Sequence, residues 1–183
     1  RYALLHKASR LSPLDERAPL AKAALLRAFA RSRFSSPGPK AMEAAAAWAD
    51  SLENARLAQR LDRYSIDALV LESELFSDRL QPGTRFPARA EEILGPLRRA
   101  GALDPCNPFL ALQQAVVLRE YGRDDEARER ARYALGLEPD YAAAIVFLHE
   151  LQGLPPGDPA LRRRLDAIKE KAARLRSRPG SYL

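Results

Sequence analysis

Apolar residues recur along most of the chain at the 3.6-residue spacing of an amphipathic helix. No run of alternating β-branched residues stands out, and Ala, Leu, Arg and Glu, which are good helix formers, dominate the composition. The pattern therefore predicts an all-α chain. The expected helices span about residues 1–11, 15–33, 39–62, 66–80, 88–103, 108–121, 124–137, 141–152 and 159–177.

Short polar side chains and prolines set the predicted helix ends. A polar side chain just before a helix can accept a hydrogen bond from a backbone N–H of the first turn. Gly95-Pro96 is expected to interrupt the helix over 88–103 with a kink, because proline lacks the backbone N–H. The predicted caps are Asp15, Ser65, Asn107, Asp140 and Asp158.

Residues 107–139 place small side chains at fixed offsets across two of these helices. With Pro108 as position 1, the pattern has Ala115 at 8, Gly122 at 15, Ala127 at 20, Ala134 at 27 and Pro139 at 32. The alanines let two antiparallel helices approach closely, and Gly122 can adopt the left-handed conformation that ends the first helix. The segment resembles the 34-residue tetratricopeptide repeat (TPR). It departs from the TPR pattern at positions 4, 7 and 24, which are Ala111, Gln114 and Ala131.

The end of this repeat recurs along the chain. An Ala, a Leu and a final Pro have the same spacing in 8–13, 100–105 and 134–139, and 58–63 lacks only the proline. The four copies end 50, 42 and 34 residues apart. The resemblance implies a TPR-like solenoid of about four antiparallel helix pairs. Within a single domain over 1–183, we expect degenerate repeats at 1–103, the best repeat at 104–140, a terminal repeat or cap at 141–177 and a flexible tail at 178–183.

The TPR resemblance also implies a binding surface. In TPR proteins the first helices of successive repeats line a concave groove that binds peptides or partner helices. The corresponding residues here are Phe109, Leu112, Val116 and Arg119, then Ile66, Leu69, Ser73 and Phe76, then Ala143 and Val146. The Lys and Asn residues that clamp a C-terminal carboxylate in some TPR domains are absent at these positions. The groove therefore suits an amphipathic helix or a hydrophobic segment, unless its apolar members are buried under neighbouring helices.

The sequence contains no recognisable catalytic constellation. It lacks GxGxxG, GxxxxGK[ST] and GxSxG motifs, and its single cysteine, Cys106, excludes an internal disulfide. The two histidines, His6 and His149, have no partner at a metal-binding spacing. Asp124-Asp125 falls in a predicted inter-helix turn, where carboxylates favour the start of a helix. We therefore expect a non-enzymatic domain without a cofactor or metal, whose partner is another protein.

Basic residues gather near the C-terminal end of a chain that carries a net charge of +6. They could bind the phosphates of RNA or of an anionic membrane. They could equally form the solvated face of a capping helix. No aromatic residues are interleaved with them for base stacking, which disfavours nucleic acid. The candidate basic patch is Arg162, Arg163, Arg164, Lys169 and Lys171.

Two segments of the chain also resemble part of a larger class of proteins. The segments KASRLSPLDERAPLAKAALLRAF and RRAGALDPCNPFLALQQAVVLREYGRDDEARERARYALGLEP look like the C-terminal TPR tails of bacterial O-antigen ligase and polymerase-like membrane proteins. The chain starts at Arg1, inside an expected helix, and no run of about 18 apolar residues occurs. We therefore expect a scaffold excised from a larger bacterial protein. It would be cytoplasmic, or periplasmic if it is attached to a membrane protein, whose own membrane domain it could contact.

Overall fold

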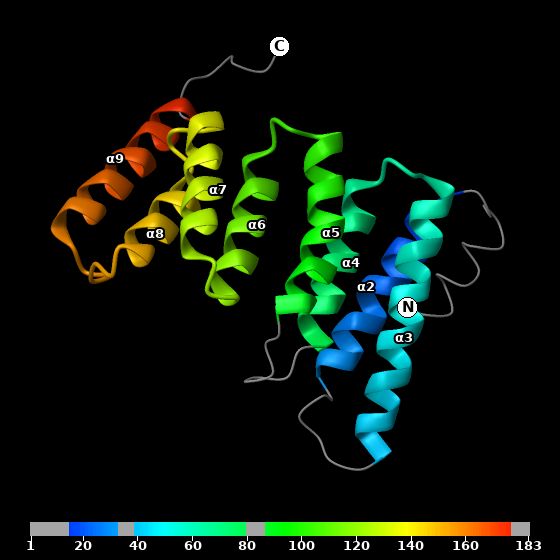
Figure 1. Ribbon diagram of the computed structural model, residues 1–183. Helices are drawn as coiled ribbons and strands as arrows, with labels where there is room; N and C mark the ends of the chain where they lie inside the picture. The colour runs from blue at the N-terminus through cyan, green and yellow to red at the C-terminus, as the bar shows by residue number, and fades with distance from the viewer. Residues whose placement is uncertain (1–14, 33–38, 80–86, 177–183) are drawn as a thin grey trace. The chain divides into compact units, whose positions relative to one another are not determined.

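The computed structural model describes residues 15–32, 39–79 and 87–176, which form α-helices joined by turns (Figure 1). No strand occurs in these segments, so the all-α prediction is confirmed. The expected helix at 1–11 and the expected tail at 178–183 lie outside the described residues. The helices are α2 (Arg17–Arg31), α3 (Pro39–Leu61), α4 (Ile66–Arg79), α5 (Pro87–Leu103), α6 (Pro108–Glu120), α7 (Asp124–Leu137), α8 (Ala142–Leu151) and α9 (Pro159–Arg176).

These helices pack as sequential antiparallel pairs in two compact units, residues 1–105 and 106–183. In the N-terminal unit α2 packs on α3 and α4 on α5, and α3 and α4 join the pairs. In the C-terminal unit α6 packs on α7, α7 on α8, and α8 on α9. The boundary lies two residues from the one predicted between the degenerate and the best repeat. The expectation of a single domain stays a prediction.

The core of the N-terminal unit combines small apolar residues with buried hydrogen bonds. Ala23, Ala55, Leu71 and Leu75 form a buried cluster. The indole Nε1 of Trp48, packed against this cluster, donates a hydrogen bond to the backbone oxygen of Leu75 over 2.7 Å. The fully buried Ser51 hydroxyl likewise donates to the backbone oxygen of Ala23 over 2.7 Å. Helices α2, α3 and α4 are therefore fixed to one another by directional bonds.

An ion-pair network at Arg27 adds to these contacts. Arg27 on α2 pairs with Glu74 and Asp78 on α4, and its side chain is only 18% exposed. Burial opposes the charge on Arg27, but its hydrogen bond to Asp78 and the charges of Asp78 and Glu74 outweigh burial and raise the pKa of the guanidinium. Arg27 therefore joins α2 to α4 across 47 to 51 residues of sequence.

The first pair of the C-terminal unit also buries alanines. Ala115 on α6 and Ala127, Ala131 and Ala134 on α7 are all 0% exposed. The absence of larger side chains at these positions lets the two helix backbones approach closely. The three predicted small positions are therefore buried in the structure, together with Ala131, which departs from the TPR pattern.

Several predicted helix ends are present in the structure. The Ser65 hydroxyl accepts from the Ala68 amide over 3.4 Å, the Asn107 side chain from the Phe109 amide over 3.1 Å, and Asp158 from the Ala160 amide over 3.1 Å. Asp15 accepts from the Arg17 amide over 3.0 Å. Gly122 has a φ of 73°, the left-handed conformation expected at the end of α6.

Two details differ from the sequence predictions. Asp140 makes no capping bond to α8, whose N-cap residue is Tyr141, because its carboxylate pairs instead with Lys171 on α9. Helix α5 continues through Gly95 and Pro96 without interruption, and the expected kink there stays a prediction. Pro96 removes one backbone hydrogen bond, but Ile93, Leu94 and Leu97 around it are at most 2% exposed. Their burial holds the helix together on both sides of the proline.

Candidate functional site

An apolar groove of about 540 Å³ opens on the C-terminal unit between α6, α8 and α9. Leu112 and Val116 contribute from α6, Ala143 and Val146 from α8, and Leu165 and Ile168 from α9. The first four residues are groove residues predicted from the sequence, and the structure brings them together. We call this site the α6/α8/α9 groove.

The other two residues predicted on α6 do not line this groove. Phe109 is 42% exposed and lies outside it. Arg119 donates to Glu150 over 2.8 Å, and its guanidinium carbon lies 5.5 Å from the centre of the Phe147 ring. Since Glu150 and Phe147 both line the groove, Arg119 positions its rim.

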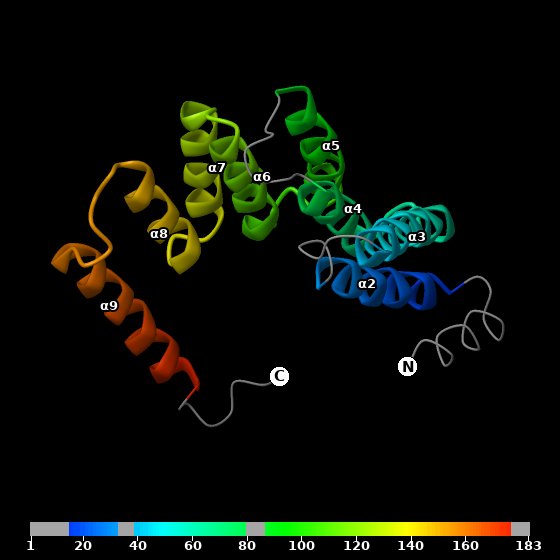
Figure 2. The ribbon, with the colours of Figure 1, turned by 90° about the horizontal axis from the view of Figure 1, so that it is seen from below.

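The contribution of α9 was not predicted from the sequence. In α9, Leu161, Leu165 and Ile168 are spaced four and three residues apart, which is the signature of one helix face. Leu161 is buried and the other two are half-buried. In Figure 2, α8 and α9 diverge more than α6 and α7 do, and their contacts are sparser. The spacing of Leu161, Leu165 and Ile168 could have predicted this apolar face, but the arginines of the same helix obscured the pattern.

The members of the predicted basic patch have different neighbours. Its five side chains are all exposed on α9. However, Lys169 pairs with Asp166 over 3.3 Å and also lines the apolar groove, and Lys171 pairs with Asp140. Arg164 lines a separate pocket of about 250 Å³ beside His149 and Asp158. Arg164, Lys169 and Lys171 therefore lie in three different environments on α9.

The residues predicted on α4 belong to the N-terminal unit and lie in different surroundings. Ser73 is 3% exposed and lies inside the unit. The Phe76 ring contacts Trp48 edge-on with 6.4 Å between ring centres. Ile66 is half-buried. Leu69, which is 3% exposed, lines a second cleft that the sequence did not indicate.

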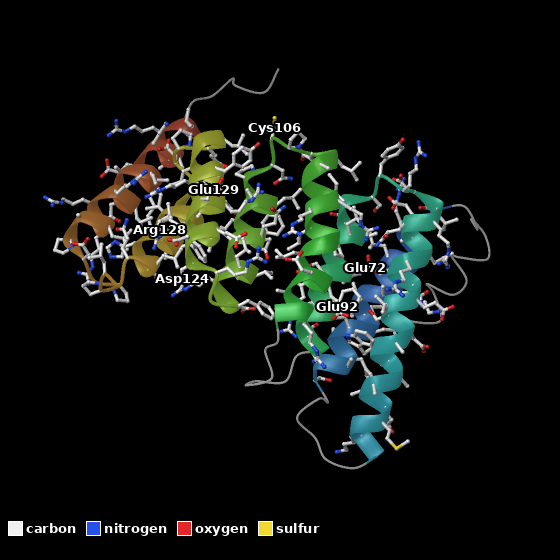
Figure 3. The ribbon with its side chains drawn as sticks, viewed as in Figure 1. Glu72, Glu92, Cys106, Asp124, Arg128 and Glu129 are labelled. Carbon is white, nitrogen blue, oxygen red and sulfur yellow. The ribbon has the colours of Figure 1, made fainter. Side chains whose placement is uncertain are left out.

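This second cleft, of about 610 Å³, lies between the C-terminal end of α3, α4 and α5. Glu72 on α4, labelled in Figure 3, lines this cleft, and its side chain is 6% exposed. Its carboxylate accepts hydrogen bonds from Arg56 (3.0 Å) and Gln59 (3.0 Å) on α3 and from Arg99 (2.9 Å) on α5. Arg60 and Arg63 complete the basic lining. We call this site the α3/α4/α5 cleft.

The candidate chemical residues occupy structural positions. His149 is 9% exposed, and its Nε2 lies 3.0 Å from the backbone oxygen of Pro155, so it holds the loop that follows α8. Cys106 is exposed in the turn between α5 and α6 (Figure 3). Within residues 15–32, 39–79 and 87–176, no three His, Cys, Asp or Glu side chains could share a metal ion. None of the helices described there is long and apolar enough to cross a membrane.

Comparison with known sequences gives a limited match. No protein family model matches the chain. Two curated relatives are named tRNA dimethylallyltransferase: one from Ralstonia nicotianae, 28% identical over 106 residues (58% of this chain, 32% of the relative), and one from Methylibium petroleiphilum, 31% identical over 102 residues (56% and 31%). The chain thus spans about a third of the length of the curated relatives it matches.

Comparison with solved structures defines the fold. A crystal structure of MamA matches 94% of this chain and 89% of its own, with a TM-score of 0.60 and 17% identity. A thermophilic TPR protein from Thermus thermophilus, TTC0263, matches 92% and 89%, with a TM-score of 0.55 and 21% identity. The chain therefore has a TPR-like helical-repeat fold.

Proposed function

We propose that this protein is an interaction scaffold whose α6/α8/α9 groove binds the apolar face of an amphipathic helix of a partner protein. The observation that carries the proposal is the convergence of four predicted residues, Leu112, Val116, Ala143 and Val146, with two apolar residues of α9 on one open groove. An exposed apolar groove bordered by charged side chains is typical of a site that a partner covers.

The lining of the groove favours a helix over an extended peptide. An extended peptide needs partners for its backbone N–H and C=O groups, whereas a helix satisfies them internally. The only polar side chains that line the groove in the described residues are Glu150 and Lys169. Glu150 already pairs with Arg119, and Lys169 with Asp166. An apolar helix face with charges of both signs along its flanks would match this arrangement.

Site-specific photo-crosslinking tests the proposal in the full-length protein. A photo-reactive amino acid at Val146 should capture a partner, and the captured peptide should map to the apolar face of an amphipathic helix. The matched control carries the same amino acid at Arg130, an exposed position on α7 outside the groove. Introducing Val116→Glu should abolish capture at position 146 while the helical circular dichroism persists. Capture of the same species from both positions, or capture that Val116→Glu leaves unchanged, would refute the groove assignment.

The other predicted functions have weaker support. A non-catalytic periplasmic tail of an O-antigen ligase or polymerase-like protein stays a prediction, because no relative or structure named above is such a protein. Contact with RNA or an anionic membrane also stays a prediction. The net charge and the two relatives named for tRNA favour RNA. Against it, Lys169 and Lys171 of the patch are already in ion pairs.

A further inference from the structure

The α3/α4/α5 cleft concentrates positive charge over an apolar base. Its lining contains four guanidinium groups, those of Arg56, Arg60, Arg63 and Arg99, and one carboxylate, that of Glu72. Four positive charges against one negative charge leave an excess of three. Beneath them lie Leu69, Ala102 and Leu103, and Leu103 is 38% exposed. An excess of positive charge beside uncovered apolar surface indicates a binding site rather than a structural ion pair.

Glu72 organises the arginines without consuming them. Its buried carboxylate accepts one hydrogen bond from Nε of Arg56 and one from Nη2 of Arg99. A guanidinium has five N–H donors in a rigid plane, so each group keeps most of its donors. The two side chains are 51% and 59% exposed, so those donors remain accessible. The arginines are thereby held from two helices with their orientation already fixed, which lowers the entropy cost of binding an anion.

The two remaining arginines are free of Glu72. Arg63 follows the end of α3, and its guanidinium carbon lies 4.6 Å from the centre of the exposed Tyr64 ring. Arg60 is exposed on the last turn of α3 and makes no ion pair with the described residues. Both can change without disturbing the bonds of the buried carboxylate.

We propose that the α3/α4/α5 cleft binds an acidic segment of a partner protein in which carboxylate side chains flank an apolar one. Guanidinium groups match carboxylates in a two-pronged geometry, and the leucine and alanine base would take the apolar side chain. A free phosphate would use the arginines but leave Leu103 uncovered. The cleft is built mainly by α3 and α5, the second helices of their pairs. The α6/α8/α9 groove belongs to the other compact unit and shares no residue with this cleft, so the two proposals stand or fall separately.

Fluorescence anisotropy on the full chain tests this proposal. The probe is a labelled peptide of about ten residues in which glutamate and leucine alternate, at about 0.15 M ionic strength, where distant charges are screened. We expect saturable binding. The double variant Arg60→Glu/Arg63→Glu should weaken it at least about tenfold, because two attractions become repulsions. The matched control, Arg130→Glu/Arg132→Glu, makes the same change in net charge on exposed positions of α7 and should change affinity less than about twofold.

Two altered peptides and an RNA separate the possible ligands. Replacing every glutamate by glutamine, or every leucine by serine, should each weaken binding at least about tenfold. The proposal is overturned if the original peptide does not saturate, if the two double variants lose affinity equally, or if the serine peptide binds as well as the leucine peptide. Tighter binding of a single-stranded RNA of equal charge, lost in Arg60→Glu/Arg63→Glu, would also overturn it and assign the cleft to phosphodiesters.

Discussion

The two units of this protein join their helices by different means. In the N-terminal unit, Trp48, Ser51 and Arg27 each bond to a partner on another helix. In the C-terminal unit, an exposed ion pair joins Arg119 on α6 to Glu150 on α8, and four alanines of α6 and α7 have no exposed surface. The unit joined by Trp48, Ser51 and Arg27 is the one whose repeat ends are 50 and 42 residues apart, and the pair of α6 and α7 falls in the repeat of 34 residues.

This difference shows two ways to specify the same kind of helix pair. Close backbone approach requires only small side chains at the right positions, and so it produces a recognisable repeat. The N-terminal unit also buries alanines, among them Ala23, Ala30, Ala55 and Ala58, and it adds buried hydrogen bonds that join α2, α3 and α4. A degenerate repeat is therefore not necessarily a weaker one.

The largest expected effect comes from enlarging a buried alanine. Ala131→Leu should lower the free energy of unfolding by about 1–3 kcal/mol, because the added atoms have no space between α6 and α7. Urea unfolding of the full chain measures this change. Arg130→Leu introduces the same side chain at the adjacent exposed position and should alter stability by less than about 0.5 kcal/mol. Equal effects would contradict close packing as the basis of this pair.

The second test removes the ion-pair network of the N-terminal unit. Arg27→Met keeps an unbranched apolar stem but removes the guanidinium, and it leaves Asp78, which is 11% exposed, without its main partner. The expected loss is about 1–2 kcal/mol, since a largely buried charged hydrogen bond disappears. The control is Arg98→Met, because Arg98 and Glu91 are each about half exposed. That variant should lose at most about 0.5 kcal/mol, and a loss as large as that of Arg27→Met would show that burial of the network does not matter.

The smallest effect distinguishes a real cap from a predicted one. Asn107→Ala should cost about 1 kcal/mol, because the Phe109 amide loses its acceptor at the start of α6. Asp140→Ala should cost only a few tenths of a kcal/mol, since Asp140 makes an exposed ion pair and no capping bond. Thermal unfolding can rank the two variants. The reverse order would mean that Asp140 caps α8 in solution.

Much of the fold could be predicted because its signals are local. The cap at Asn107 and the turn at Gly122 depend on residues within a few positions of each other, and the helix boundaries agree with prediction to within about two residues. The predicted cap at Asp140 is absent because the Asp140 carboxylate pairs with Lys171, 31 residues further along the chain. No local pattern indicates which partner such a side chain takes.

Whether a candidate site could be predicted also depended on whether its signal is local in the sequence. Leu112, Val116, Ala143 and Val146 were predicted because the repeat register fixes which helix face they occupy. The α3/α4/α5 cleft was missed because Arg56 and Arg99 meet only through Glu72 on a third helix. The chain contains 30 lysines and arginines. Arg56 and Arg99 lie 43 positions apart, with Glu72 between them, and nothing in this spacing singles them out in the sequence.

The packing of each helix mainly on its neighbours in sequence has a consequence for how the chain folds. Such contacts close short loops, and the loss of chain entropy before the first favourable contact is correspondingly small. Proteins with low contact order fold within microseconds to milliseconds. The contact between α2 and α4, which skips one helix, closes a longer loop and should form later than the pairs themselves. The Arg27 network that stabilises the N-terminal unit would then slow its unfolding without speeding its folding.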